Sequence, residues 1–145
     1  MISRFPAPVR FLLVLAGMLF LAAGSALAQD PRATQAQAAA RAWLALTDAG
    51  DVQGSWKAGG KKFQASLDVE SWEEALQKVR TPLGQMMGRS VLATRFLSSM
   101  PGGPDGDYAQ ILYDTTFLEV GPSRETVTLE REPDGVWRVI GYYIR

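Results

Sequence analysis

Apolar residues recur at steps of three and four in the first half of the chain and alternate with polar ones in the last third. This change of period predicts helices followed by strands. The helical pattern is clearest at Thr34–Ala49, where alanines dominate. It returns after Asp51 and again after Asp68 or Ser71, polar residues that suit helix N-caps. The segment Lys61–Leu67 fits either a helical turn or a short extended piece.

Four strands are predicted in the last third, at Arg89–Ser99, Asp107–Leu118, Arg124–Arg131 and Val136–Ile144. The connections between them are rich in glycine and proline, at 101–106, Gly121-Pro122 and Pro133-Asp134-Gly135. Short connections between successive strands favour an antiparallel meander. We therefore predict an α+β fold in which N-terminal helices pack on a C-terminal four-stranded antiparallel meander.

The last connection also predicts which side chains face the core. Pro133-Asp134-Gly135 suits a three-residue hairpin loop, which pairs Leu129 with Val139 and Glu130 with Arg138. With the regular alternation of a strand, the predicted core face carries Val127, Leu129, Trp137, Val139 and Tyr143, under Trp43 and Trp72.

The opposite face would then carry Ile140, Tyr142 and Ile144 in a row, too apolar for a face open to water. We expect these three residues to form a contact surface, for a homodimer or for another part of the same chain. A two-residue Asp-Gly loop would shift the register by one residue and change these partners.

The start of the chain has the pattern of a secretory signal peptide. Arg4 and Arg10 precede the apolar run Phe11–Ala23, and Ala26-Leu27-Ala28 offers a small-x-small cleavage site. A membrane anchor is the alternative, but a spanning helix needs roughly 20 apolar residues, and this run is shorter. We predict cleavage after Ala28, which leaves residues 29–145 as a single periplasmic or secreted domain.

Charge and composition exclude several function classes. Residues 1–28 contain two arginines and no acid, so the remaining chain has a net charge near −2 and no basic stripe. Nucleic acid and, after cleavage, a membrane surface are therefore not expected as partners. The chain has no histidine and no cysteine. It thus lacks an imidazole base, a thiolate and the usual zinc or haem ligands. It also lacks a glycine-rich phosphate loop, and we predict neither cofactor nor metal.

Several short motifs together resemble the domain-of-unknown-function family 4019, a family of small exported bacterial proteins. They follow one another over nearly the whole mature chain: Trp43-Leu44, Asp48-Ala49-Gly50-Asp51, Ser55-Trp56, Trp72, Val79-Arg80, Pro82-Leu83-Gly84, Pro101-Gly102, Pro104-Asp105-Gly106, Glu125-Thr126-Val127-Thr128-Leu129, Gly135, Trp137-Arg138-Val139, Gly141-Tyr142 and Ile144-Arg145. The resemblance implies no activity, because the family has none agreed, and no catalytic residue can be transferred from it.

The order of helices before a curved sheet is also similar to the cystatin-like roll of the nuclear transport factor 2 superfamily. That superfamily contains isomerases, dehydratases, ligand binders and dimerisation modules, so the similarity does not indicate which of these functions the chain has. Ketosteroid isomerase, one of its members, pairs carboxylic acids with a tyrosine. Here Asp114, which lies in a predicted strand beside Tyr113, is the candidate base, with Asp48 as a weaker one.

A pocket for a small apolar ligand is the other candidate site. Trp43, Trp56 and Trp72 could line it between the helices and the sheet, or they could be core residues. The sequence favours a non-catalytic binding or protein-interaction module, and the alternative is a small lyase or isomerase with Asp114 as base. The observation that separates these functions is whether Asp114 points into a cavity close to a tyrosine hydroxyl.

Overall fold

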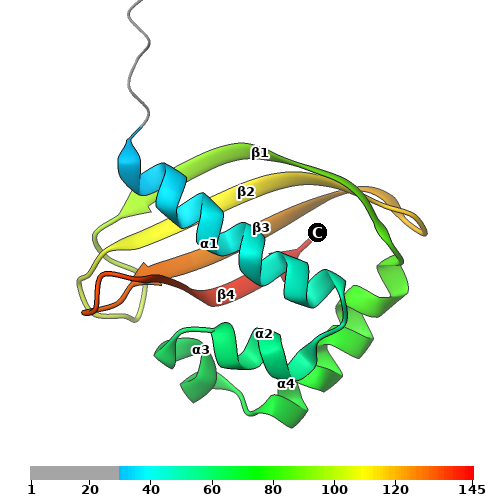
Figure 1. The fold of residues 1–145 in the computed structure, drawn as a ribbon, viewed down its shortest axis with the longest axis horizontal. Coiled ribbons are helices and arrows are strands. Elements are labelled where there is room, and N and C mark those ends of the chain that lie inside the picture. The colour runs from blue at the N-terminus through cyan, green and yellow to red at the C-terminus, as the bar shows by residue number, and fades with distance from the viewer. Residues whose placement is uncertain (1–29) are drawn as a thin grey trace, which may run out of the picture.

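The computed structural model describes residues 30–145, in which helices come first and a four-stranded antiparallel sheet follows. Helix α1 lies across one face of the sheet, and the shorter helices gather beside its last strand (Figure 1). This arrangement confirms the predicted α+β class, with N-terminal helices on a C-terminal meander. The predicted cleavage site after Ala28 lies outside the described residues.

Aspartates cap three of the helices. Asp30 precedes α1 and accepts a hydrogen bond from the Arg32 amide. Asp51 and Asp68 cap α2 and α4 in the same way, each accepting a hydrogen bond from the amide three residues further along the chain. Asp68, not Ser71, is therefore the cap of α4, and the undecided segment after Gly60 is helical. The helices are α1 (Pro31–Asp48), α2 (Val52–Ala58), α3 (Lys61–Ser66) and α4 (Val69–Ala75).

Helix α4 continues into a wider π-helical turn, η1 (Leu76–Arg80), and then into a 3₁₀ turn, η2 (Thr81–Leu83), where Pro82 ends the helix. The predicted apolar stripe of this helix, Trp72, Ala75, Leu76 and Val79, lies along one side of a surface cleft. π-turns within helices are rare and are found frequently at functional sites.

The sheet has the strand order β1-β2-β3-β4, so β1 and β4 are its edges. Its strands are β1 (Met86–Leu97), β2 (Tyr108–Phe117), β3 (Gly121–Arg131) and β4 (Trp137–Ile144). The connection predicted at Gly121-Pro122 is wrong by three residues, because both already belong to β3 and the turn lies at 118–120. Proline is tolerated there because the start of a strand does not need its amide.

The register of β3 with β4 agrees with the prediction only up to Val139. Leu129 pairs with Val139 and Glu130 with Arg138, as expected. Thr128 then pairs with Gly141, so Ile140 is an extra residue, a β-bulge. Beyond it every side chain changes face relative to the predicted pattern: Tyr142 and Ile144 lie on the face toward the helices, and Tyr143 lies on the outer face.

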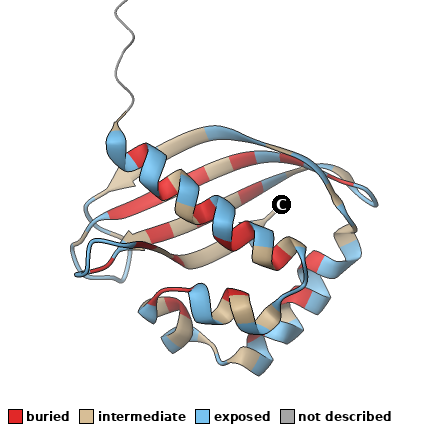
Figure 2. Ribbon diagram, in the orientation of Figure 1, coloured by how far each residue is buried: buried red, intermediate tan, exposed pale blue. Residues whose placement is uncertain are grey.

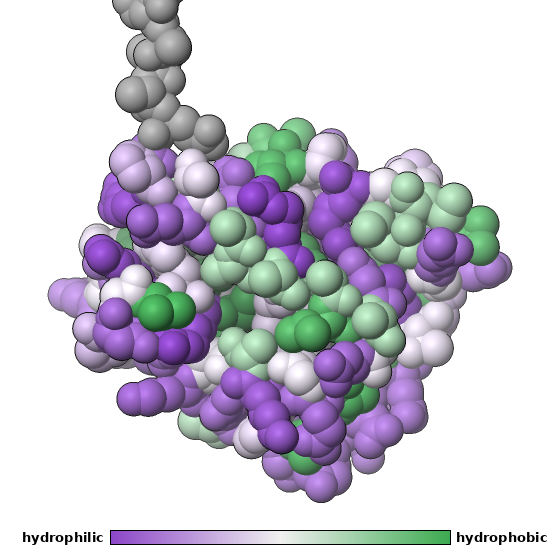
Figure 3. All heavy atoms as spheres, in the orientation of Figure 1, coloured by the Kyte–Doolittle hydropathy of each residue, from purple (hydrophilic) through white to green (hydrophobic). Residues whose placement is uncertain are grey.

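The core lies between α1 and the sheet, where buried positions alternate along β2 and β3 (Figure 2). Of the predicted core residues, Tyr143 is exposed and the others are all buried there: Trp43, Trp72, Val127, Leu129, Trp137 and Val139. Figure 3 shows apolar residues over α1 in the middle of this side of the molecule and hydrophilic residues around them. Alanines such as Ala36 and Ala40, both fully buried, allow α1 to approach the sheet closely.

Candidate functional site

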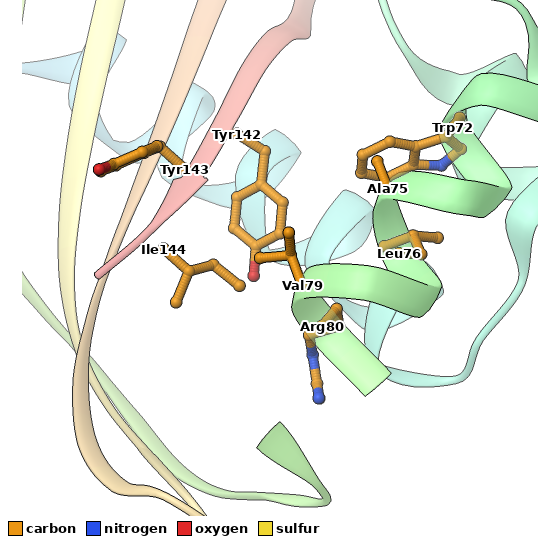
Figure 4. A pocket seen from close by; sticks show the side chains of 8 residues that line it. All are labelled: Trp72, Ala75, Leu76, Val79, Arg80, Tyr142, Tyr143 and Ile144. Carbon is orange, nitrogen blue, oxygen red and sulfur yellow. The ribbon is translucent and has the colours of Figure 1, made fainter. Parts of the chain in front are cut away.

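An apolar cleft of about 220 Å³ lies between helix α4–η1 and the end of strand β4. Tyr142 and Ile144 line it on the strand side, and the helical wall opposite consists of Trp72, Ala75, Leu76, Val79 and Arg80 (Figure 4). Tyr143, which lines the rim, points away from the helix. The bulge at Ile140 is the reason that Tyr142 and Ile144, and not Tyr143, face this cleft.

A buried carboxylate lies behind Tyr142. Glu125 is fully buried on β3, and its carboxylate accepts hydrogen bonds from the Tyr142 hydroxyl, from Thr115 Oγ1 at 2.5 Å and from two nitrogens of Arg89, at 2.6 and 3.2 Å. Each of these residues comes from a different strand and occupies a core-facing position. Both oxygens of Glu125 are thus saturated by its neighbours, as a buried charge requires.

The same network includes the last residue of α1. Asp48 accepts a bidentate pair of hydrogen bonds from Arg89, at 2.7 and 3.0 Å, and one from Arg80 of η1 at 3.1 Å. An acid at a helix C-terminus is unfavourable to the helix dipole, and the two guanidinium groups offset this. With two acids and two arginines, Asp48, Arg80, Arg89 and Glu125 form a network without net charge.

Burial and charge shift the pKa values of several groups in this network. Burial alone would lower the pKa of the Arg89 guanidinium, but hydrogen bonds to Asp48 and Glu125 raise that pKa above its ordinary value. Burial, reinforced by the charge of Glu125, raises the pKa of the Tyr142 hydroxyl. At neutral pH the tyrosine is therefore a neutral hydrogen-bond donor and the arginine a permanent cation.

The predicted catalytic pair is not formed. Asp114 lies on the outer face of the sheet, where its half-exposed carboxylate pairs with Arg124 of β3 at 2.5 Å. Tyr113, the next residue, points to the opposite face, and its buried hydroxyl has no hydrogen-bond partner among residues 30–145. Neighbours in a strand face opposite sides, so Asp114 and Tyr113 cannot act together. The weaker candidate, Asp48, does belong to the buried network, in ion pairs with two arginines.

The three tryptophans do not line one pocket. Trp43 is a core residue whose ring lies 5.6 Å from Trp72 and 5.2 Å from Tyr142, and its indole donates to the Ser55 carbonyl. Trp56 donates to the Leu67 carbonyl and fixes the α2–α3 hairpin. Of the three, Trp72 alone lines the apolar cleft, and its indole donates to the Ser55 hydroxyl at 2.9 Å.

The predicted outer patch of Ile140, Tyr142 and Ile144 does not exist as one surface. Ile140 stays on the outer side, but the bulge turns Tyr142 and Ile144 toward the helices. The outer face beside β4 instead carries Thr126, Thr128 and Gly141. Self-association remains a prediction, although not through a surface composed of these three residues.

Two residues central to the site, Glu125 and Arg89, were not among the sequence candidates. The signal was available: Glu125 stands two residues before Val127 in the core-facing alternation Glu125, Val127, Leu129. A charged residue in phase with core positions indicates a buried, paired group. Arg89 could not be placed in the same way, because the register shifts in β1 break its alternation.

The chain matches the family model described as proteins of unknown function, DUF4019, over residues 39–142, and it therefore belongs to that family. No match was found among curated proteins. Within residues 30–145, no helix has the length and apolar character that a membrane crossing needs. Those residues also contain no cluster of acidic side chains suited to hold a metal ion.

Proposed function

We propose that the chain is an exported, non-catalytic binding module that holds an apolar group in the cleft between β4 and helix α4–η1. The observation that carries this proposal is an open apolar cleft above a buried carboxylate, Glu125, whose two oxygens already accept hydrogen bonds from its neighbours. The helical wall exposes Val79 to solvent, by 51%. Exposed apolar residues that line a concave surface are typical of contact sites.

The alternative, a lyase or isomerase with a buried carboxylate and a tyrosine, would now have to use Glu125 and Tyr142. Glu125 would have to give up hydrogen bonds from Arg89 or Thr115 before it could accept a proton from a substrate. The hydroxyl of Tyr142 donates to Glu125 and is not directed at the cleft as a free donor. These contacts favour binding over catalysis.

The helices over the sheet support a further part of the proposal, a relationship to the cystatin-like roll (Figure 1).

Indole is a suitable probe, since an apolar cavity of about 150 Å³ already accommodates benzene. We expect a titration followed by amide and side-chain NMR to shift signals of Leu76, Val79, Tyr142 and Ile144. Val79→Asp should weaken indole binding about tenfold, because the new carboxylate loses water against an apolar ring. Val120→Asp is the matched control, since Val79 and Val120 are both 51% exposed but Val120 lies outside the cleft.

Two results would contradict the proposal. Indole could leave the signals of the cleft unshifted, or Val79→Asp and Val120→Asp could bind it equally well. The exported location is tested separately, at the amino terminus of the mature protein.

A further inference from the structure

Strand β4 is an edge strand, and its last residues direct backbone groups away from the sheet. Arg124 and Arg145 exchange both of their backbone hydrogen bonds, at 2.9 Å each. In an antiparallel ladder, such pairs alternate with pairs that make no hydrogen bonds to each other. The residues paired in the second way are Glu125 with Ile144 and Val127 with Tyr142. Tyr142 and Ile144 thus direct their amide and carbonyl groups away from β3.

These backbone groups lie at the apolar cleft. Tyr142 and Ile144 form its strand wall, with Tyr143 at the rim, and Trp72, Leu76 and Val79 lie on the wall opposite (Figure 4). Within residues 30–145 these groups have no backbone hydrogen-bond partner. They are two residues apart, which is the repeat at which one strand hydrogen-bonds to the next. A small apolar ligand would leave them without partners. A polypeptide backbone would satisfy them while one of its side chains entered the cleft.

A backbone segment of the chain itself covers part of the β4 edge. The amide of Gly60, between α2 and α3, donates to the Val139 carbonyl at 2.7 Å, so a backbone segment already occupies the first half of the β4 edge. Ile140 forms the bulge that follows it. The other edge strand, β1, has register shifts between Met86 and Gly88 and between Val91 and Ala93. Register irregularities of this kind discourage strand addition, and the part of β4 that is both regular and uncovered is its end.

We propose that this cleft binds an extended peptide segment of a partner protein, which adds as a strand to Tyr142 and Ile144 and inserts one apolar side chain between β4 and helix α4–η1. The inference rests on the proposed function and names the occupant of the same site. A cleft of about 220 Å³ accommodates a leucine or phenylalanine side chain. In strand addition, the main chain provides affinity and the pockets beneath alternate side chains provide specificity.

The peptide residues on either side of this anchor face the outer side of the sheet. That side carries the exposed Tyr143, with the Arg145 guanidinium 5.4 Å from its ring centre. Polar or acidic residues are therefore expected next to the apolar anchor.

A library of random dodecapeptides displayed on phage provides the probe, selected against the mature chain. Selected peptides, made synthetically, should slow amide hydrogen exchange of Tyr142 and Ile144 by about tenfold or more. N-methylation of each peptide residue in turn should weaken binding by about tenfold at alternate residues only, because those residues donate to β4. Val79→Asp should reduce binding of the peptides, and the control Val120→Asp should not.

The proposal is overturned if selection yields no binders, if the binders leave both amides unprotected, or if N-methylation is tolerated at every position. It is also overturned if both amides are protected in a dimer of the chain without any peptide, because a second copy would then occupy the edge. Indole separates the two levels. If indole binds in the cleft but no peptide adds as a strand, this inference is wrong and the proposed function stands. If neither indole nor a peptide binds, both are wrong.

Discussion

Arg89 and Glu125 form a buried ion pair across a strand that separates them, with 2.6 Å between Nε of Arg89 and Oε1 of Glu125. The arginine belongs to β1 and the glutamate to β3, and Thr115 of the intervening β2 donates to the same carboxylate. The arginine also binds Asp48 at the end of α1. One guanidinium therefore fixes helix α1 to the sheet, and Tyr142, which lines the cleft, is held by the carboxylate beside it.

The first prediction concerns this pair. Glu125→Ala should lower the free energy of unfolding by about 3–5 kcal/mol, because it leaves the Arg89 charge buried with one partner fewer. Urea unfolding followed by tryptophan fluorescence measures the loss. Glu73→Ala, at an exposed site on α4, should change stability by less than roughly 0.5 kcal/mol. Equal effects of the two substitutions would mean that the buried network contributes nothing.

The second prediction uses the unpaired hydroxyl of Tyr113. Burial raises the pKa of Tyr113 from 10.0 to about 12. The unfolded chain therefore loses this proton at a lower pH than the folded chain does. The protonated Tyr113 hydroxyl therefore makes a contribution to the free energy of unfolding that is complete below pH 10 and is lost as pH rises toward about 12. Tyr113→Phe should remove this part of the alkaline loss. At neutral pH it should be neutral or stabilising by up to about 1 kcal/mol, because a buried hydroxyl without a partner is costly.

Urea unfolding of both proteins at several pH values from about 9 to about 11.5 tests this prediction. The stability curve of Tyr113→Phe should fall less steeply with pH than that of the wild type. It should still fall, because the pKa of Tyr142 is raised as well. Parallel curves for the two proteins would show that Tyr113 has the same pKa in the folded and unfolded chains.

Trp137 provides the third prediction. Trp137 is 5% exposed, and the centre of its ring lies 6.0 Å from that of Phe96. Trp137→Ala should cost about 3–5 kcal/mol, the usual range for a buried aromatic side chain reduced to a methyl group. Val136, the preceding residue, is exposed, and Val136→Ala provides the control. A cost below about 1 kcal/mol for Trp137→Ala would be typical of a surface residue instead.

The sequence predicts this sheet correctly where core-facing and outward-facing residues alternate along a strand without interruption. Leu129 and Val139 were placed correctly because nothing interrupts the ladder between them and the turn at Pro133-Asp134-Gly135. The turn chemistry specifies that register. The starts of α2 and α4 were also predictable, because Asp51 and Asp68 mark their caps, whereas α1 begins at Pro31, before the predicted Thr34, with Asp30 as its cap.

The cleft was not predictable, because it depends on the single extra residue at Ile140. No sequence pattern near Ile140 predicts this bulge. If side chains are assumed to alternate regularly beyond it, Tyr142 and Ile144 are placed on the wrong face of the sheet. The buried network was missed for a different reason. Its members, Asp48, Arg80, Arg89 and Glu125, are far apart in the sequence, and only the packing of α1 and η1 on the sheet brings them together.

The fourth prediction is export. If the signal-peptide pattern is used, mass spectrometry of protein recovered from outside the cytoplasm should find Gln29 at the amino terminus. Ala26→Leu replaces one of the small residues required at the cleavage site and should leave the precursor uncut. A mature protein that retains residues 1–28 in the wild type would contradict the prediction.

The last prediction tests the bulge directly. Because Ile140 is an extra residue, its deletion leaves Leu129 paired with Val139 and Thr128 with Gly141, and no other side chain changes face. The deletion should therefore fold, with a loss within the roughly 0.5–3 kcal/mol of common substitutions. Part of that loss is the contact between the Ile140 side chain and Gly60.

Deletion of Thr126 from the regular part of β3 is the control. It also removes one outward-facing residue, but nothing in β4 compensates for it, so either Glu125 or Val127 must turn away from the core. This variant should lose cooperative thermal unfolding when followed by circular dichroism, whereas the Ile140 deletion should keep it. If both deletions unfold the protein equally, the prediction is wrong. Strand β4 then does not tolerate a regular register at position 140, and the position of Tyr142 depends on the bulge itself.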